Sequence, residues 1–209
     1  MSADAVRAAM LNCLDRCRDH EAELGRLDAV AGDGDHGAGM VRGFTAACLA
    51  TDGFEGAAPA SITAAGSAFA DAAGGASGAL WGVFLQTIGR SLEGGALTPS
   101  RVVAAIRDGE AQLERLGKSH PGDKTLLDTL VPFLDALDAR VCEGARLSEA
   151  WAGSLATARE ATEATSRMVA RRGRSAVLGE RSLGTVDPGA LSLLYVLEAV
   201  LPVIVKEEA

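Results

Sequence analysis

The sequence has few aromatic residues and few runs of β-branched residues. Aromatic side chains make up 4% of the 209 residues, whereas Ala and Gly are abundant. Runs of Val, Ile and Thr long enough for a strand are scarce, which argues against a β-sheet core and favours an all-α fold with close helix contacts. No linker rich in Pro, Ser or charge divides the chain, so residues 1–209 are predicted to form one domain.

Positive charge is also scarce. The formal net charge is −8, and affinity for nucleic acid or an anionic membrane comes from clustered Lys and Arg. Neither partner is therefore expected, and a phosphate ligand would need a local source of positive charge. The four cysteines include no Cys-x-x-Cys pair, and Cys13 and Cys17 stand one helical turn apart, where core packing is the usual explanation. These thiols indicate a reducing compartment.

A long hydrophobic run is missing as well. The most apolar segment, 190–205, has 16 residues and is interrupted by Ser192, Glu198 and Pro202, which is short for a membrane span. The N-terminal residues include the charged Asp4 and Arg7 in place of an apolar run, so no export signal is visible. We therefore expect a cytoplasmic protein with a buried C-terminal helix.

Apolar residues recur every three or four positions through most of the chain, which predicts eight helices. The first runs over about 3–24, the second over about 37–50, and the seventh from Leu147 to Val169. Loops rich in Gly, Asp and Ser follow every second helix. In an up-and-down helical array, such loops lie at the same end, so one composite site is predicted from residues 26–37, 74–78, 117–125 and 173–189.

The first of these loops contains three carboxylates in the spacing D-x4-D-x-D: Asp28, Asp33 and Asp35. Convergent carboxylates repel one another unless a cation lies between them. Oxygen ligands in a loop with open positions suit Mg²⁺, and two such ions would leave positive charge for a phosphate. The alternative is a solvated turn.

Two other patterns are rejected. Residues 32–37 read G-x-G-x-x-G, but no β-branched strand precedes them and the intervening acids would repel a pyrophosphate. Residues 117–119 end like a Walker A loop, yet Gln112 stands where its first glycine belongs. The Gly-Gly-Ala-Ser-Gly segment at 74–78 leaves two readings open: backbone approach to a phosphate aided by Ser77, or a crowded helix contact.

The motifs together resemble the nucleotide-binding L subunit (DhaL, DAK2-type domain) of dihydroxyacetone kinases. The resemblance runs in order through 27–37, 74–78, 121–125, 171–182 and 186–190, and so covers nearly the whole chain. It implies an eight-helix antiparallel up-and-down barrel, with a nucleotide and two Mg²⁺ ions capping one end.

Carried over by motif, the resemblance implies metal ligands and nucleotide contacts but no certain catalytic residue on this chain. The metal ligands would be Asp28, Asp33 and Asp35. The contacts to ADP or ATP would be His36, Gly37, Ala38, Gly39, Ala76, Ser77, Gly117, Leu126, Arg174, Asp187, Pro188 and Gly189. Two positions depart from the family pattern: Gly39 replaces a frequent Asn, and Leu126 replaces a Met.

The implied function is phosphoryl transfer from Mg-nucleotide to a short ketose held on a partner K subunit. The preferred version keeps ADP bound as a coenzyme, which a phosphotransferase-system M protein rephosphorylates. Two alternatives stay open: exchangeable ATP as co-substrate, and a nucleotide-sensing module that binds a regulatory partner. The sequence specifies neither the ketose, with dihydroxyacetone as default, nor whether the chain forms a homodimer.

Overall fold

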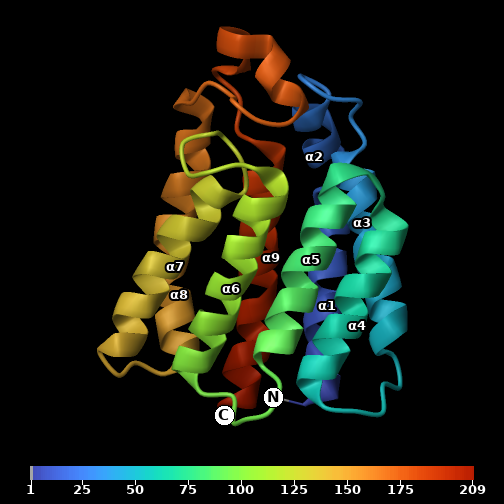
Figure 1. The fold of residues 1–209 in the computed structure, drawn as a ribbon, viewed down its shortest axis with the longest axis vertical. Helices are drawn as coiled ribbons and strands as arrows, with labels where there is room; N and C mark the ends of the chain where they lie inside the picture. Colours follow the sequence, from blue (N-terminus) through green and yellow to red (C-terminus); the bar gives the residue numbers. More distant parts are fainter. Residues whose placement is uncertain (1) are drawn as a thin grey trace.

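The computed structural model describes residues 2–209, except for the side chain of Arg174. Within this part the fold is all-α and no strand occurs, as predicted. Eight long helices run up and down (Figure 1): α1 (Ala3–Asp19), α3 (His36–Thr51), α4 (Ala58–Ala73), α5 (Gly75–Ser91), α6 (Pro99–Gly117), α7 (Leu127–Cys142), α8 (Leu147–Ala164) and α9 (Pro188–Glu207).

The eight helices close into a barrel. Each long helix packs against the next along the chain, and α9 packs against α1 to complete the ring. The shorter elements are α2 (Glu21–Asp28) and the 3₁₀ segments η1 (Thr165–Arg167) and η2 (Arg174–Ser182). Figure 1 shows α2 and η2 at one end of the barrel, with both chain termini at the other. The predicted eight-helix antiparallel barrel is confirmed.

The few aromatic residues are concentrated in the core. Phe44 and Phe69 meet edge to face with ring centroids 5.0 Å apart, and Trp81 lies 6.0 Å from each. Elsewhere small residues bring helices together. A Cβ added to Gly66 of α4 would lie 2.8 Å from Gln86 N and 2.9 Å from Gly82 O of α5. The predicted role of glycine in close helix contacts is confirmed here.

Helix α9 is long and apolar enough to cross a membrane by length and composition alone. In the structure it packs against α1, α7 and α8, and Leu193, Leu197 and Val203 are buried in the core. The predicted buried C-terminal helix is thus confirmed. The four cysteines are free thiols, with Cys13 and Cys17 in the core.

Two predicted helix boundaries are wrong. The first helix breaks at His20 (φ −113°, ψ 10°), and α2 resumes in a new direction to Asp28. The seventh ends at Ala164 instead of Val169, because Thr165 Oγ1 accepts a hydrogen bond from Asp187 N at 2.9 Å and so ties the helix end to a distant loop. Periodicity within one segment does not record such long-range bonds.

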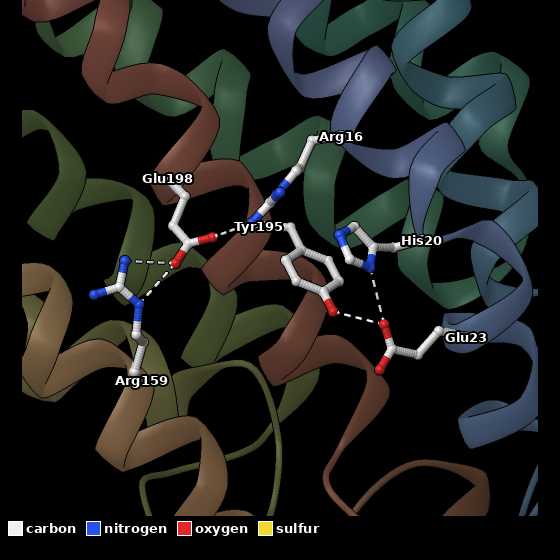
Figure 2. A network of polar contacts seen from close by, with 6 residues as sticks. All are labelled: Arg16, His20, Glu23, Arg159, Tyr195 and Glu198. Atoms are coloured by element: carbon white, nitrogen blue, oxygen red, sulfur yellow. Dashed lines mark hydrogen bonds and ion pairs between the residues drawn. The ribbon is translucent and has the colours of Figure 1, made fainter.

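A polar network on the barrel wall joins α1, α2, α8 and α9 (Figure 2). Glu198 of α9 accepts from Arg16 of α1 at 2.6 Å and pairs with Arg159 of α8 at 2.7 Å. Tyr195 donates its hydroxyl to Glu23 Oε2 at 2.7 Å, and His20 stacks on the Tyr195 ring at 4.0 Å. This network fixes the direction of α2 relative to α9, and with it the position of Asp28.

We expect the Gly66→Ala variant to unfold more easily than the wild type. The added methyl would meet backbone atoms of α5 that cannot move locally, and overpacking of this kind costs about 1–3 kcal/mol. Gly153→Ala in α8 is the matched control, because the nearest atoms to its methyl would be those of the movable Arg140 guanidinium. That control should stabilise the protein by about 0.5–1 kcal/mol through helix propensity. Urea titration followed by circular dichroism measures both, and equal midpoints would contradict the packing argument.

Candidate functional site

One cavity of 490 Å³ lies at the α2 end of the barrel. Its lining residues come from 28–39, 73–80, 113–127, 172–175 and 187–189. These segments are the four Gly-, Asp- and Ser-rich loops together with the helix ends that flank them. The prediction that alternate loops gather into one composite site is therefore confirmed.

The three carboxylates converge beside this cavity. Asp28 ends α2, the loop turns back at Gly34 with a left-handed φ of 77°, and Asp35 directly precedes α3. One oxygen from each of Asp28, Asp33 and Asp35 lies within 4.8 Å of the others. Asp28 Oδ2 is buried without a hydrogen-bond partner. A buried carboxylate oxygen of this kind is costly, and a divalent cation with oxygen ligands would satisfy it.

Two glycines allow the acidic loop to pack this closely. A Cβ on Gly32 would lie 2.6 Å from Asp28 Oδ1, and a Cβ on Gly37 would lie 2.1 Å from the backbone oxygen of Glu21. The absence of a side chain at Gly37 thus allows α3 to pack closely against α2. Neither Gly37 nor Ala38 lines the cavity, whereas their neighbours His36 and Gly39 do.

His36, which lines the cavity, connects helices α3, α5 and α9. Its Nε2 lies 2.9 Å from Ser192 Oγ, and its Nδ1 lies 3.3 Å from Ser77 Oγ. Ser192 gives its own hydrogen to Gly189 O at 3.0 Å, so His36 Nε2 is the donor in that pair. Burial lowers the pKa of His36, while Asp28 acts in the opposite direction. A neutral ring with Nδ1 accepting from Ser77 fits this arrangement.

The Gly-Gly-Ala-Ser-Gly segment at 74–78 places the start of α5 beside the cavity. Gly74 and Gly75 have φ of 72° and 62°, and a Cβ on either would meet nothing within 4 Å. Gly78, by contrast, packs against α4, where its Cβ would lie 3.2 Å from Ala70 O. The helix-contact reading therefore holds for Gly78, whereas approach to a phosphate at Gly74 and Gly75 stays a prediction. Ala76 and Ser77 line the cavity in the first turn of α5, where helix N–H groups lack intrahelical partners and favour anions.

The cavity wall across from the acidic loop is apolar. It is formed by α5, α6 and the start of α7. Its residues are Leu80, Leu113, Leu116, Leu126 and Leu127, and Gly117 lies at its edge. Leu116 lines the cavity and is 51% exposed. A flat apolar wall of this type suits an aromatic base.

Asp128 shapes the loop beside this wall. Its Oδ1 accepts from Gly122 N at 2.5 Å and its Oδ2 from Thr125 N at 2.7 Å. Thr125 Oγ1 in turn accepts from Leu127 N at 3.2 Å. Asp128 and Thr125 thus satisfy backbone N–H groups of the turn that leads into α7.

The last wall consists of Asp187, Pro188 and Gly189 at the start of α9. Asp187 caps this helix, since its Oδ2 accepts from Ala190 N at 2.8 Å. Burial raises the pKa of Asp187 to about 7, although the cap bonds and Lys124 act in the opposite direction. The side chain of Arg174 lies outside the described residues, so its predicted phosphate contact stays a prediction. Arg172 does line the cavity and pairs with Asp123 at 3.4 Å.

Sequence reasoning missed one prominent residue of this site. Lys124 lines the cavity, is only 4% exposed and points its ammonium into a cluster of backbone carbonyls. Burial lowers the pKa of Lys124, and Asp187 acts in the opposite direction. The Pro-Gly-Asp-Lys-Thr motif indicated the position, but no pattern in the sequence indicated what the charge would contact.

Comparison with known proteins places the chain among its relatives. The sequence profile of the DAK2 domain matches residues 30–202. The chain belongs to the DAK2 domain family. It is 44% identical over 208 residues to an L-erythrulose kinase of Pectobacterium atrosepticum, covering 97% of this chain and 35% of that protein. This DAK2 domain thus spans about a third of the length of that relative.

A second relative has nearly the same length as this DAK2 domain. The ADP-binding subunit DhaL of the PEP-dependent dihydroxyacetone kinase of Escherichia coli (strain K12) is 33% identical, covering 92% of this chain and 94% of its own. Among solved structures, the dihydroxyacetone kinase from C. freundii in complex with AMP-PNP and Mg²⁺ matches with a TM-score of 0.70 and 28% identity. The match covers 94% of this chain and 33% of that one.

We expect the double variant Asp33→Ala/Asp35→Ala to lose Mg²⁺-dependent affinity for ADP and ATP. Each substitution removes one oxygen ligand and one negative charge from the cluster, and a loss of about a hundredfold or more is expected for two ligands of three. Isothermal titration calorimetry with Mg-ADP measures it. The matched control is Asp71→Ala, an exposed carboxylate on α4, which should bind like the wild type. Unchanged affinity in the double variant would contradict a metal site here.

Proposed function

We propose that this DAK2 domain binds Mg-nucleotide in the cavity and supplies a phosphoryl group to a short ketose held on a separate domain or subunit of the K type. The observation that carries the proposal is the orphaned Asp28 oxygen within a three-carboxylate cluster, beside a cavity of 490 Å³. Such a cluster suits divalent cations that hold the terminal phosphates of a nucleotide.

Different residues of the chain would bind the metal ions, the phosphates and the base. Asp28, Asp33 and Asp35 would hold two Mg²⁺ ions, which when bound neutralise phosphate charge. First-turn N–H groups of α3 and α5, with Ser77, would orient the terminal phosphates. The leucine wall of α5, α6 and α7 would hold the base and keep water from it. Phosphoryl transfer requires mainly positioning and charge neutralisation, so no side chain of this chain need act as the base.

The comparisons support a ketose as acceptor. Identity reaches 44% with the L-erythrulose kinase and 48% over 179 residues with a D-erythrulose kinase of Mycolicibacterium smegmatis, against 33% with the PEP-dependent DhaL subunit. A four-carbon ketose is therefore proposed ahead of dihydroxyacetone. The same ranking by sequence identity favours exchangeable ATP over ADP held as a coenzyme, because PEP dependence is named only for the less similar of these relatives.

The function is tested by reconstitution. We expect the chain, mixed with the ketose-binding K region of an erythrulose kinase, Mg²⁺ and ATP, to produce phosphorylated erythrulose detectable by mass spectrometry. Asp33→Ala/Asp35→Ala should produce none, because the nucleotide is no longer held. Nucleotide binding without transfer to erythrulose or dihydroxyacetone would instead favour the nucleotide-sensing module.

The donor is tested separately by the nucleotide that the purified protein retains. With ATP as an exchanging co-substrate, gel filtration should yield protein without stoichiometric ADP, and added ATP should support repeated turnover. ADP that remains bound through gel filtration, with turnover only after a phosphoprotein donor is added, would contradict the ATP proposal. Absorbance at 260 nm and chromatography of the released nucleotide give the measurement.

A further inference from the structure

The ammonium group of Lys124 is surrounded by backbone carbonyls of one distant segment. It donates to Met168 O at 3.3 Å, to Thr185 O at 2.8 Å and to Ser182 O. A lysine ammonium has three donors, so these three acceptors account for all of them. The acceptors lie at both ends of residues 168–185, and Lys124 thereby draws the two ends of this segment together.

This segment forms one wall of the nucleotide cavity. Arg172, Gly173 and Ser175 line the cavity from its middle, and Asp187, two residues beyond its end, lines the cavity as well. Figure 1 shows the segment lying over the end of the barrel, close to α2. It has no regular α-helix of its own between Ala164 and Pro188, so its path depends on tertiary contacts.

The other contacts of the segment include the Arg172–Asp123 ion pair at 3.4 Å and several hydrogen bonds of backbone N–H groups. Ala170 N donates to Ser182 Oγ at 2.9 Å, Arg171 N to Asp123 O at 3.0 Å and Gly184 N to Ser166 O at 2.8 Å. These are neutral hydrogen bonds, whereas those of Lys124 are charge-assisted and roughly twice as strong. Loss of the ammonium would also leave buried carbonyls unsatisfied.

The backbone of Lys124 is uncommon for a non-glycine residue. Its φ of 62° lies in the left-handed region, which non-glycine residues occupy in only a few per cent of cases. This conformation occurs within the loop 117–125, whose flanks also carry Gly117 and Leu126 of the opposite cavity wall. Lys124 therefore links the loop beside the leucine wall to the segment 168–185.

We propose that Lys124 is a positioning residue that holds residues 168–187 as the wall of the nucleotide cavity, and so sets nucleotide affinity more than the rate of phosphoryl transfer. The proposal rests on the proposed function for the identity of the ligand. Lys124 also lines the cavity, but its ammonium faces the carbonyls of this segment, so it would act on the nucleotide through the wall that it holds.

The test compares Lys124→Met with Lys118→Met. Both lysines lie in the same loop with left-handed φ, 62° and 49°, but Lys118 is exposed. We expect Lys124→Met to raise the Kd for Mg-ATP about tenfold or more, since three charge-assisted bonds are lost. In the reconstituted kinase, KM for ATP should rise in parallel while kcat changes less than about threefold. Lys118→Met should match the wild type in both.

Limited trypsin digestion without nucleotide gives a second readout that needs no ketose. Cleavage after the arginines at 171–174 should be about tenfold faster in Lys124→Met. Ser182→Ala removes the Ala170 bond while keeping Lys124, and it should change Kd and cleavage in the same direction by a smaller factor. It keeps the proposal testable if Lys124→Met does not fold.

Three outcomes would overturn the proposal. They are wild-type Kd and cleavage in Lys124→Met, a fall in kcat with unchanged KM, and, if that variant does not fold, wild-type behaviour of Ser182→Ala. Failure of the proposed function looks different: the wild type itself would not bind Mg-ATP, yet the cleavage rates would still report whether Lys124 holds the segment.

Discussion

Three carboxylates at the end of α2 place their oxygens within 4.8 Å of one another, and this crowding of like charge is the constraint on which the site depends. Bringing them together requires glycine at 32 and 37, where any Cβ would strike Asp28 or the backbone of Glu21. It also leaves one oxygen of Asp28 buried without a partner. A buried carboxylate oxygen in such a cluster is costly without a compensating positive charge, and a bound divalent cation would supply that charge.

The barrel supplies the remaining parts of the site through its topology. Because successive helices alternate in direction, every second loop reaches the same end, and helices α3, α5 and α9 begin there with their N-termini toward the cavity. Close helix contacts through Gly66 and its neighbours keep this framework rigid. The network of Glu198, Tyr195 and Glu23 on the outer wall then holds α2 at a fixed angle (Figure 2).

The two sides of the cavity are stabilised by different physical means. The leucine side belongs to long helices and is held by the core. The side formed by 168–187 has little regular structure. It is held by hydrogen bonds that Lys124 donates to it and by those that it donates to the carbonyls of Asp123 and Ser166. A segment held by a few polar contacts opens at lower free energy than a helical core does. Opening of the cavity is therefore easiest on that side.

Sequence alone determined the helical class, the buried C-terminal helix, the four loops of the site and the acidic trio, because each depends on local spacing or on alternation of helix direction. It did not determine the break at His20, the packing role of Gly37 or the partners of Lys124. Only the tertiary structure decided these. Every residue carries the same backbone carbonyl, so the acceptors at Met168, Ser182 and Thr185 leave no mark in the sequence, and only folding brings them to one ammonium group.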